Sequence, residues 1–221
     1  AIVWLYRGQR ARFLALVRGY LSQVCAESAA IPPVIATFDA TLADLRQRFD
    51  PLAKTVSKLA GIDAAKTQAL ADAAAELRDA VTPYQTDRTK LLAALNGFGK
   101  RYSKALPDAN DKQHAARRTF DPIAEAIRGV IKQVDLLYKL TARVSELGTG
   151  LANEVAGDGA VAAVYDRRAA GKLVKQLDEE RKATVEQLKH AVYFHRQVAW
   201  LQDRFPKAEL QAVPGLVKLV D

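Results

Sequence analysis

The stretch FDPIAEAIRGVIKQVDLLYKLTARVSEL, residues 120–147, decides the fold class of this chain. Its apolar residues and one threonine recur at alternating spacings of four and three, at Ile123, Ile127, Val130, Val134, Leu137, Thr141 and Val144. A strand would alternate with a period of two, whereas this spacing places all seven residues on one face of an α-helix. The stretch therefore predicts a long helix with a coiled-coil-like seam that packs against other helices.

A second helix of the same kind is predicted over residues 160–205. Its stripe has Arg181 and His195 as polar interruptions and otherwise consists of Leu177, Val185, Leu188, Val192 and Ala199. The segment GTGLANEVAGDG, residues 148–159, is expected to be a flexible loop between this helix and the first, over 113–147. The two helices are then the arms of a long antiparallel hairpin. The second arm either lies across its own bundle or projects from it toward a partner.

The N-terminal half is expected to hold three further helical stretches, over residues 1–28, 35–60 and 63–106. Pro32 and Pro33 predict an extended turn between the first two. Gly61 is expected to close the second stretch, and Asp63 to cap the third.

Proline also occurs inside the predicted helical stretches, at Pro51, Pro83 and Pro122. Each of the three marks either a kink or a break. The sequence Phe-Asp-Pro occurs twice, at 49–51 and 120–122, and an Asp cap followed by a first-turn proline is typical of a helix start.

Composition supports an all-α fold, because Ala is frequent and only 12 Gly and 8 Pro occur among 221 residues. The turn-rich segment LPDANDKQ, residues 106–113, suggests a division into an N-terminal part, 1–111, and a C-terminal part, 112–221, that holds the hairpin and a tail. The expected architecture is an elongated helical bundle.

The chain is basic, with 33 Lys and Arg against 25 Asp and Glu and a formal net charge of +8. The excess of basic residues is spread along the chain. It indicates either a polyanionic partner or a basic surface that only keeps the chain soluble. Two readings stay open for the basic clusters: contact with DNA or a partner, or pairing with carboxylates such as Asp178, Glu179 and Glu180. The candidate contact residues are Lys100, Arg101, Lys104, Arg117, Arg118, Arg167, Arg168, Lys172 and Lys175.

No set of residues with catalytic, cofactor-binding or metal-binding spacing is found. His190 and His195 are five residues apart, which puts them on different sides of a helix, and Cys25 has no basic neighbour at helical spacing. The glycine-rich segment lacks the phosphate-loop motifs. One cysteine and no apolar run of about 20 residues lead us to expect a cytoplasmic protein without a membrane partner.

The opening stretch AIVWLYRGQRARFLALVRGYL, residues 1–21, has the pattern of an amphipathic helix but no capping residue before it. We therefore expect the chain to be an excerpt of a longer protein.

This opening stretch, together with HAVYFHRQVAWLQDRFPKAELQAVPGLVKLVD at 190–221, resembles the C-terminal part of modification subunits of type I restriction–modification systems, which are adenine-N6 DNA methyltransferases. The middle, about residues 30–185, matches only as variable helical filler. The family's catalytic Asn-Pro-Pro-aromatic motif has no counterpart, since the only Pro-Pro lies in AIPPV at 30–34. No catalytic residue is carried over, and S-adenosylmethionine is expected only in a catalytic domain outside this chain.

The resemblance implies an assembly role. Helices of this region would dock with the helical specificity subunit and help to clamp DNA, in a complex that also holds the restriction subunit. The alternative is a free-standing coiled-coil scaffold or self-associating bundle, in which the chain forms a homo-oligomer. A third hypothesis is independent, non-specific DNA binding through residues 165–175.

Overall fold

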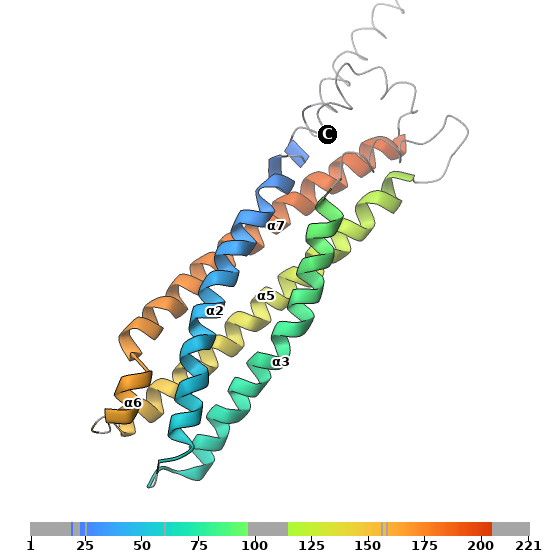
Figure 1. The fold of residues 1–221 in the computed structure, drawn as a ribbon. Coiled ribbons are helices and arrows are strands. Elements are labelled where there is room, and N and C mark those ends of the chain that lie inside the picture. Colours follow the sequence, from blue (N-terminus) through green and yellow to red (C-terminus); the bar gives the residue numbers. More distant parts are fainter. Residues whose placement is uncertain are drawn as a thin grey trace, which may run out of the picture. The chain divides into compact units, whose positions relative to one another are not determined.

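The computed structural model describes residues 19, 23–24, 26–59, 61–96, 115–155, 157 and 159–204, with the side chains of 115–121 and 198–204 left outside the description. These residues form helices and no strand, so the predicted all-α fold is confirmed. The elements in chain order are α2 (Ile31–Val56), α3 (Ala64–Leu95), α5 (Ala115–Glu154), α6 (Gly159–Val164) and α7 (Arg167–Arg204) (Figure 1).

The chain divides into two compact units, and the divisions fall inside α2, α3, α5 and α7. The first unit comprises Ala1–Pro32, Arg88–Gly129 and Glu186–Asp221, and the second comprises Pro33–Asp87 and Val130–Val185. Each unit draws on both sides of the turn-rich segment 106–113, which itself lies outside the described residues. Most of the opening stretch 1–21 and the tail from residue 205 lie outside them as well.

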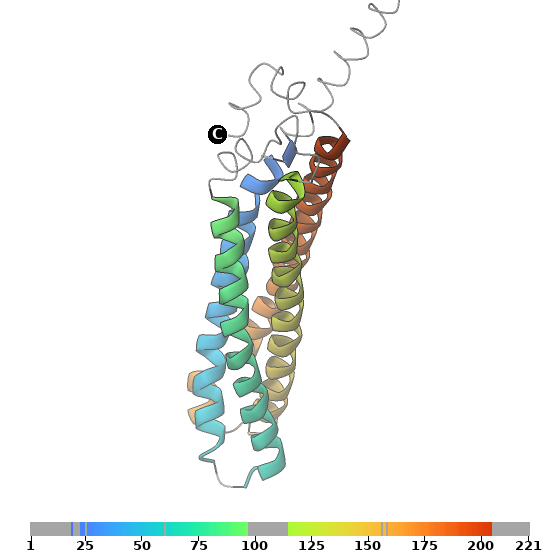
Figure 2. The same cartoon turned by 90° about the vertical axis from the view of Figure 1, so that its right-hand side faces the viewer.

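The second unit is a four-helix bundle in which α2, α3, α5 and α7 form a closed ring of neighbours (Figures 1 and 2). Neighbouring helices run antiparallel, as the ion pairs Lys66–Glu154 and Arg143–Glu76 show for α3 and α5. The other three contacts of the ring are the Tyr84 hydroxyl to Asp39 (2.5 Å), Arg181 to Asp135 (2.9 Å) and the Thr41 hydroxyl to Glu180 (3.0 Å).

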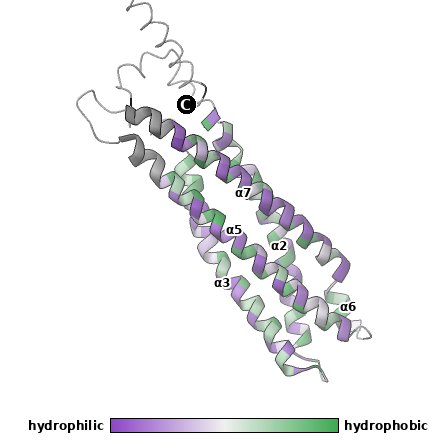
Figure 3. Ribbon diagram, turned by 180° about the vertical axis from the view of Figure 1, so that it is seen from behind, coloured by the Kyte–Doolittle hydropathy of each residue, from purple (hydrophilic) through white to green (hydrophobic). Residues whose placement is uncertain are grey.

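Two regular apolar seams, on α5 and α2, contribute to the core. The seven residues of the predicted α5 seam are all at most 3 % exposed, so this prediction is confirmed. A matching seam on α2 was not identified from the sequence, although its spacing alternates three and four without a fault: Ile35, Phe38, Leu42, Leu45, Phe49, Leu52 and Val56. Figure 3 shows the alternation of apolar and polar residues along the helices.

Pro32 and Pro33 do not form the extended turn that the sequence predicted. α2 begins at Ile31, so Pro32 and Pro33 lie in its first turn, where backbone N–H groups have no helical partner anyway. The predicted extended turn is wrong.

Both Phe-Asp-Pro sequences lie inside helices, because α2 runs on to Val56 and α5 already begins at Ala115. They are therefore not helix starts. Pro51 and Pro122 are exposed, and Pro83, inside α3, is exposed too. An interior proline costs about 3 kcal/mol of helix stability. Burial of the apolar residues before and after the proline offsets this cost.

The predicted loop at 148–159 is also wrong over its first half. α5 continues through Gly148 and Gly150 to Glu154, and Leu151 and Ala152 are buried. Gly148 is needed for close packing, since a Cβ there would lie 2.6 Å from the Leu52 Cδ2 atom.

The helix predicted over 160–205 is divided into α6 and α7 by Tyr165 and Asp166. The long hairpin as a whole stays a prediction, because its arms belong partly to each unit. By contrast, the predicted cap at Asp63, which accepts from the Ala65 N–H at 2.8 Å, is confirmed. Gly61 (φ +86°) lies in the turn between α2 and α3, but α2 already ends at Val56, so the predicted closure of the helix by Gly61 is wrong.

Two glycines of α5 provide a matched test of this packing. Gly148→Ala should lower the free energy of unfolding by about 1 kcal/mol, because overpacking against Leu52 costs about 1–3 kcal/mol and helix propensity returns about 1. Gly150→Ala has open space and should raise the free energy by about 1 kcal/mol. Urea denaturation measures both, and equal shifts in the two variants would contradict the close contact at Gly148.

Candidate interaction surface

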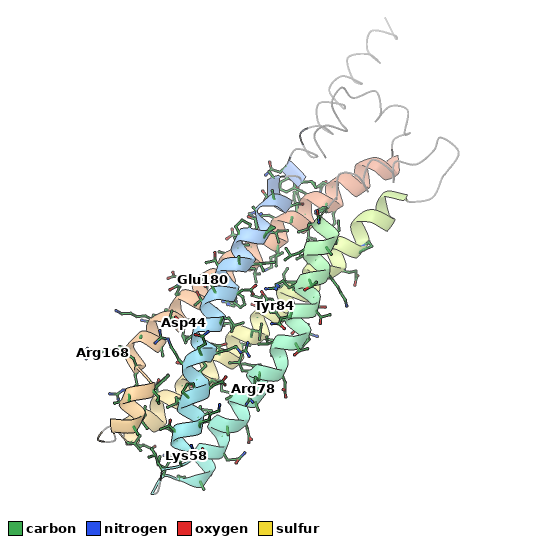
Figure 4. All side chains as sticks on the ribbon, viewed as in Figure 1. Asp44, Lys58, Arg78, Tyr84, Arg168 and Glu180 are labelled. Atoms are coloured by element: carbon green, nitrogen blue, oxygen red, sulfur yellow. The ribbon has the colours of Figure 1, made fainter. Side chains whose placement is uncertain are left out.

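A row of three cations occupies the outer face of α7 in the second unit. Arg168, Lys172 and Lys175, named here the basic stripe, are spaced four and three residues apart, so they share one helix face. All three are exposed, and Figure 4 shows Arg168 projecting away from the bundle. The opposite face of the helix, with Ala170 and Leu177, is fully buried.

The start of α7 is fixed by Asp166, which holds the basic stripe in this orientation. Its carboxylate accepts the backbone N–H groups of Arg168 (2.9 Å) and Ala169 (3.1 Å), as an N-cap residue does. The hydrogen bond from Ala169 and then that from Arg168 lower the pKa of the Asp166 carboxyl below 3.8. The Asp166 charge is therefore directed at the helix start.

The acidic residues expected to neutralise the stripe have other partners or none. Asp178 pairs with Arg181 (2.7 Å) and Lys182 (2.6 Å), and hydrogen bonds from Lys182 and then Arg181 lower its pKa. Glu180 accepts from the Thr41 hydroxyl and from Gln176. Within the described ranges, no ion-pair partner lies within 4.0 Å of Arg168, Lys172, Lys175 or Glu179.

Arg167 differs from its neighbour Arg168. Its guanidinium donates a hydrogen bond to the Asn153 side chain at the end of α5. It also lines a pocket of about 390 Å³ whose walls come from the end of α5, α6 and the start of α7, with Ala152, Val161 and Tyr165 among the apolar residues. Arg167 is therefore tied into the connection between the helices.

The other predicted contact residues cannot be placed beside the stripe. Lys100, Arg101 and Lys104 lie outside the described residues. Arg117 and Arg118 belong to the first turn of α5, but their side chains are not described. The structure thus brings together only Arg167, Arg168, Lys172 and Lys175 of the nine.

Arg181, which interrupts the apolar pattern of α7 in the sequence, joins two helices in the second unit. It is about one-quarter exposed, binds Asp135 of α5 and Asp178 of its own helix, and its guanidinium lies 4.9 Å from the centre of the Tyr138 ring. The sequence does contain a signal for this pairing. Arg181 interrupts the apolar spacing of α7, and the facing helix carries Asp135 and Tyr138, three residues apart.

His195 lies in the first unit and is fully buried, although it interrupts the apolar pattern of α7. Its Nε2 atom is 3.1 Å from the Ser28 hydroxyl oxygen. Burial disfavours the charged imidazolium and lowers the pKa to about 4. His190 is exposed on the same helix, and His114 lies outside the described residues.

Among the described residues, no cluster of three or more His, Cys, Asp or Glu side chains is arranged to hold a metal ion. The described helices also include none with both the length and the hydropathy of a membrane span. Cys25 lies outside the described residues.

Comparison of the chain with protein-family models, with curated proteins and with solved structures gave no match.

Burial of His195 predicts a pH-dependent stability. The folded chain favours the neutral imidazole, so its stabilisation is complete above pH 6.5 and is lost as the pH falls toward 4. The loss amounts to about 3 kcal/mol for a pKa lowered to about 4. Urea denaturation between pH 7 and 4 should therefore show a steep fall for the wild type and a shallower one for His195→Gln.

The matched control is His190→Gln, which removes an exposed imidazole from the same helix. It should follow the wild-type pH profile. An unchanged profile in His195→Gln would show that His195 is not the group responsible.

Proposed function

We propose that this chain is a non-catalytic helical module of the modification subunit of a type I restriction–modification system. It docks with the helical specificity subunit and helps to hold DNA, while methyl transfer to adenine and S-adenosylmethionine binding belong to the catalytic domain of the parent enzyme. The resemblance of residues 1–21 and 190–221 supports the family, and an outer face of α2 supports the docking role.

The apolar seams themselves are not free to dock in the second unit. Leu52 of α2 is fully buried beside Gly148, and Leu137 of α5 and Leu177 of α7 are also 0 % exposed. A partner helix must therefore use outer faces of the bundle.

The outer face of α2 is the one suited to a helix. Five exposed, uncharged residues, named here the α2 row, follow one another at spacings of three and four: Pro33, Ala36, Ala40, Ala43 and Gln47. Helix axes lie 8–10 Å apart depending on the side chains between them, so alanines permit a close approach. The same spacing forms the holes that receive side chains of a partner helix in a coiled coil. The α2 row is the observation that carries the proposal.

The specificity subunit is the favoured partner, because the resemblance implies a helical one. The scaffold alternative rests on the same face, since the α2 row of a second copy would meet the same geometric requirement. The two hypotheses differ in what is bound, and a single substitution tests both.

Ala40→Arg should prevent docking, because a long charged side chain would hold the helices apart and lose its hydration at the contact. We expect at least about a tenfold loss of co-purified specificity subunit when the full modification subunit carries this change, which corresponds to about 1.4 kcal/mol or more. Circular dichroism should remain that of the wild type, since Ala40 is exposed.

Ala65→Arg is the control, as it adds the same charge at an exposed alanine of α3. Equal co-purification of the two variants would contradict docking on the α2 row. Sedimentation of the isolated chain tests the alternative, because a discrete homodimer that Ala40→Arg dissociates would favour the self-associating scaffold.

A further inference from the structure

We propose that the basic stripe, together with Gly171, binds the phosphates along one strand of double-stranded DNA without reading base sequence. The inference rests on the DNA contact in the proposed function and assigns it to one face of α7 in the second unit. Its basis is the absence of ion pairs within 4.0 Å among the described residues, the spacing of the cations and the open space on that face.

Among the described residues, none of the three cations of the stripe is ion-paired, whereas some other cations of the second unit are. Lys66 pairs with Glu154, Arg143 with Glu76, and Lys182 with Asp178 at 2.6 Å. Within the described part of the second unit, no such partner is found for the three cations of the stripe. The stripe ends at Lys175, because the next basic residue on that face, Lys182, is already paired.

The spacing of the stripe fits a phosphate chain. At about 1.5 Å per residue, Arg168, Lys172 and Lys175 span roughly 10.5 Å along the helix axis. One strand of B-form DNA carries a phosphate about every 3.4 Å along its axis, so this length faces about three phosphates. Three cations over three phosphates give charge complementarity without any contact to base edges.

Gly171 supplies an independent observation. It lies within a helix and is exposed, it has no positive φ, and a Cβ built on it meets nothing within 4 Å. The fold therefore gives no reason for a residue that costs about 1 kcal/mol relative to Ala in a helix. On the surface, a missing side chain beside Arg168 and Lys175 lets a sugar–phosphate chain approach the helix backbone.

The surroundings of the stripe favour DNA over an anionic membrane. A helix that lies in a membrane interface buries an apolar face in the lipid, whereas the apolar face of α7 here, with Leu177 and Ala170, is buried in the bundle. The exposed neighbours are not apolar either, since Gln176 is neutral and polar and Glu179 is acidic. Figure 3 shows this predominantly hydrophilic character of α7.

The test compares two triple variants of the full chain, each of which lowers the formal net charge from +8 by three. The stripe variant carries Arg168→Gln, Lys172→Gln and Lys175→Gln. The control variant carries Lys66→Gln, Arg128→Gln and Arg143→Gln, which removes cations that are ion-paired. Fluorescence anisotropy measures binding to a labelled duplex of about 24 base pairs with arbitrary sequence, between about 50 and 200 mM salt.

In the stripe variant, the slope of log affinity against log salt should become shallower by about 2.7, and affinity at about 100 mM salt should fall at least a hundredfold. The control variant should stay within about threefold of the wild type, because its charges are already neutralised locally. An equal loss in both variants would mean that net charge alone attracts DNA, and would overturn the assignment. Absence of wild-type binding would overturn it as well.

Gly171→Leu supplies the second readout. The substitution should leave the free energy of unfolding unchanged or raise it, since the site is open, yet weaken DNA binding about tenfold by filling the space between the cations. Unchanged binding in Gly171→Leu would contradict the close approach.

Vesicles that contain phosphatidylserine serve as the competing polyanion. Tighter binding to vesicles than to the duplex, lost in the stripe variant, would replace DNA by a membrane surface. Ala40 lies outside the stripe, so co-purification with the specificity subunit is a separate measurement. If the stripe fails to bind DNA, the docking proposal still stands.

Discussion

Burial of the apolar seams of α2 and α5 is the constraint on which the second unit depends. Each seam offers a large side chain at every third or fourth residue, and the close contact of Leu52 with Gly148 shows how tightly the two helices meet. Complete burial of one such side chain contributes about 1.5–3 kcal/mol, which exceeds most local preferences of the chain. The ion pairs and hydrogen bonds between neighbouring helices then follow from the register that the seams impose.

This constraint explains which parts of the fold could be predicted from the sequence. The α5 seam and the Asp63 cap are local patterns, and they were predicted correctly. Pro51, Pro122 and Gly148 are local signals of the opposite kind, each typical of a helix end. The sequence left a kink and a break open at the two prolines, and it wrongly predicted a loop at Gly148. Packing on both sides of each residue holds the helix together, and that packing depends on residues about a hundred positions away, such as Leu52 for Gly148.

The polar residues that interrupt the apolar pattern of α7 show more clearly what the sequence alone cannot predict. Arg181 and His195 occupy equivalent interruptions of the α7 pattern, yet one binds Asp135 near the surface and the other is fully buried beside Ser28. Their spacing along α7 cannot distinguish these outcomes, since the difference lies in which helix faces each residue. A carboxylate opposite Arg181 compensates a charge, whereas burial of His195 favours the neutral ring.

The candidate surface depends on the same distinction between position and partner. The sequence located Arg168, Lys172 and Lys175 and also offered Asp178, Glu179 and Glu180 as neutralising residues. In the folded chain Asp178 is held by Arg181 and Lys182, and Glu180 binds Thr41. Glu179 is exposed, and in the described part of the chain no ion pair within 4.0 Å joins it to the three cations. A net charge of +8 therefore does not by itself describe the surface. An anionic partner depends on the subset of cations that the fold leaves without a carboxylate. These cations can bind phosphate without first breaking an ion pair within the protein.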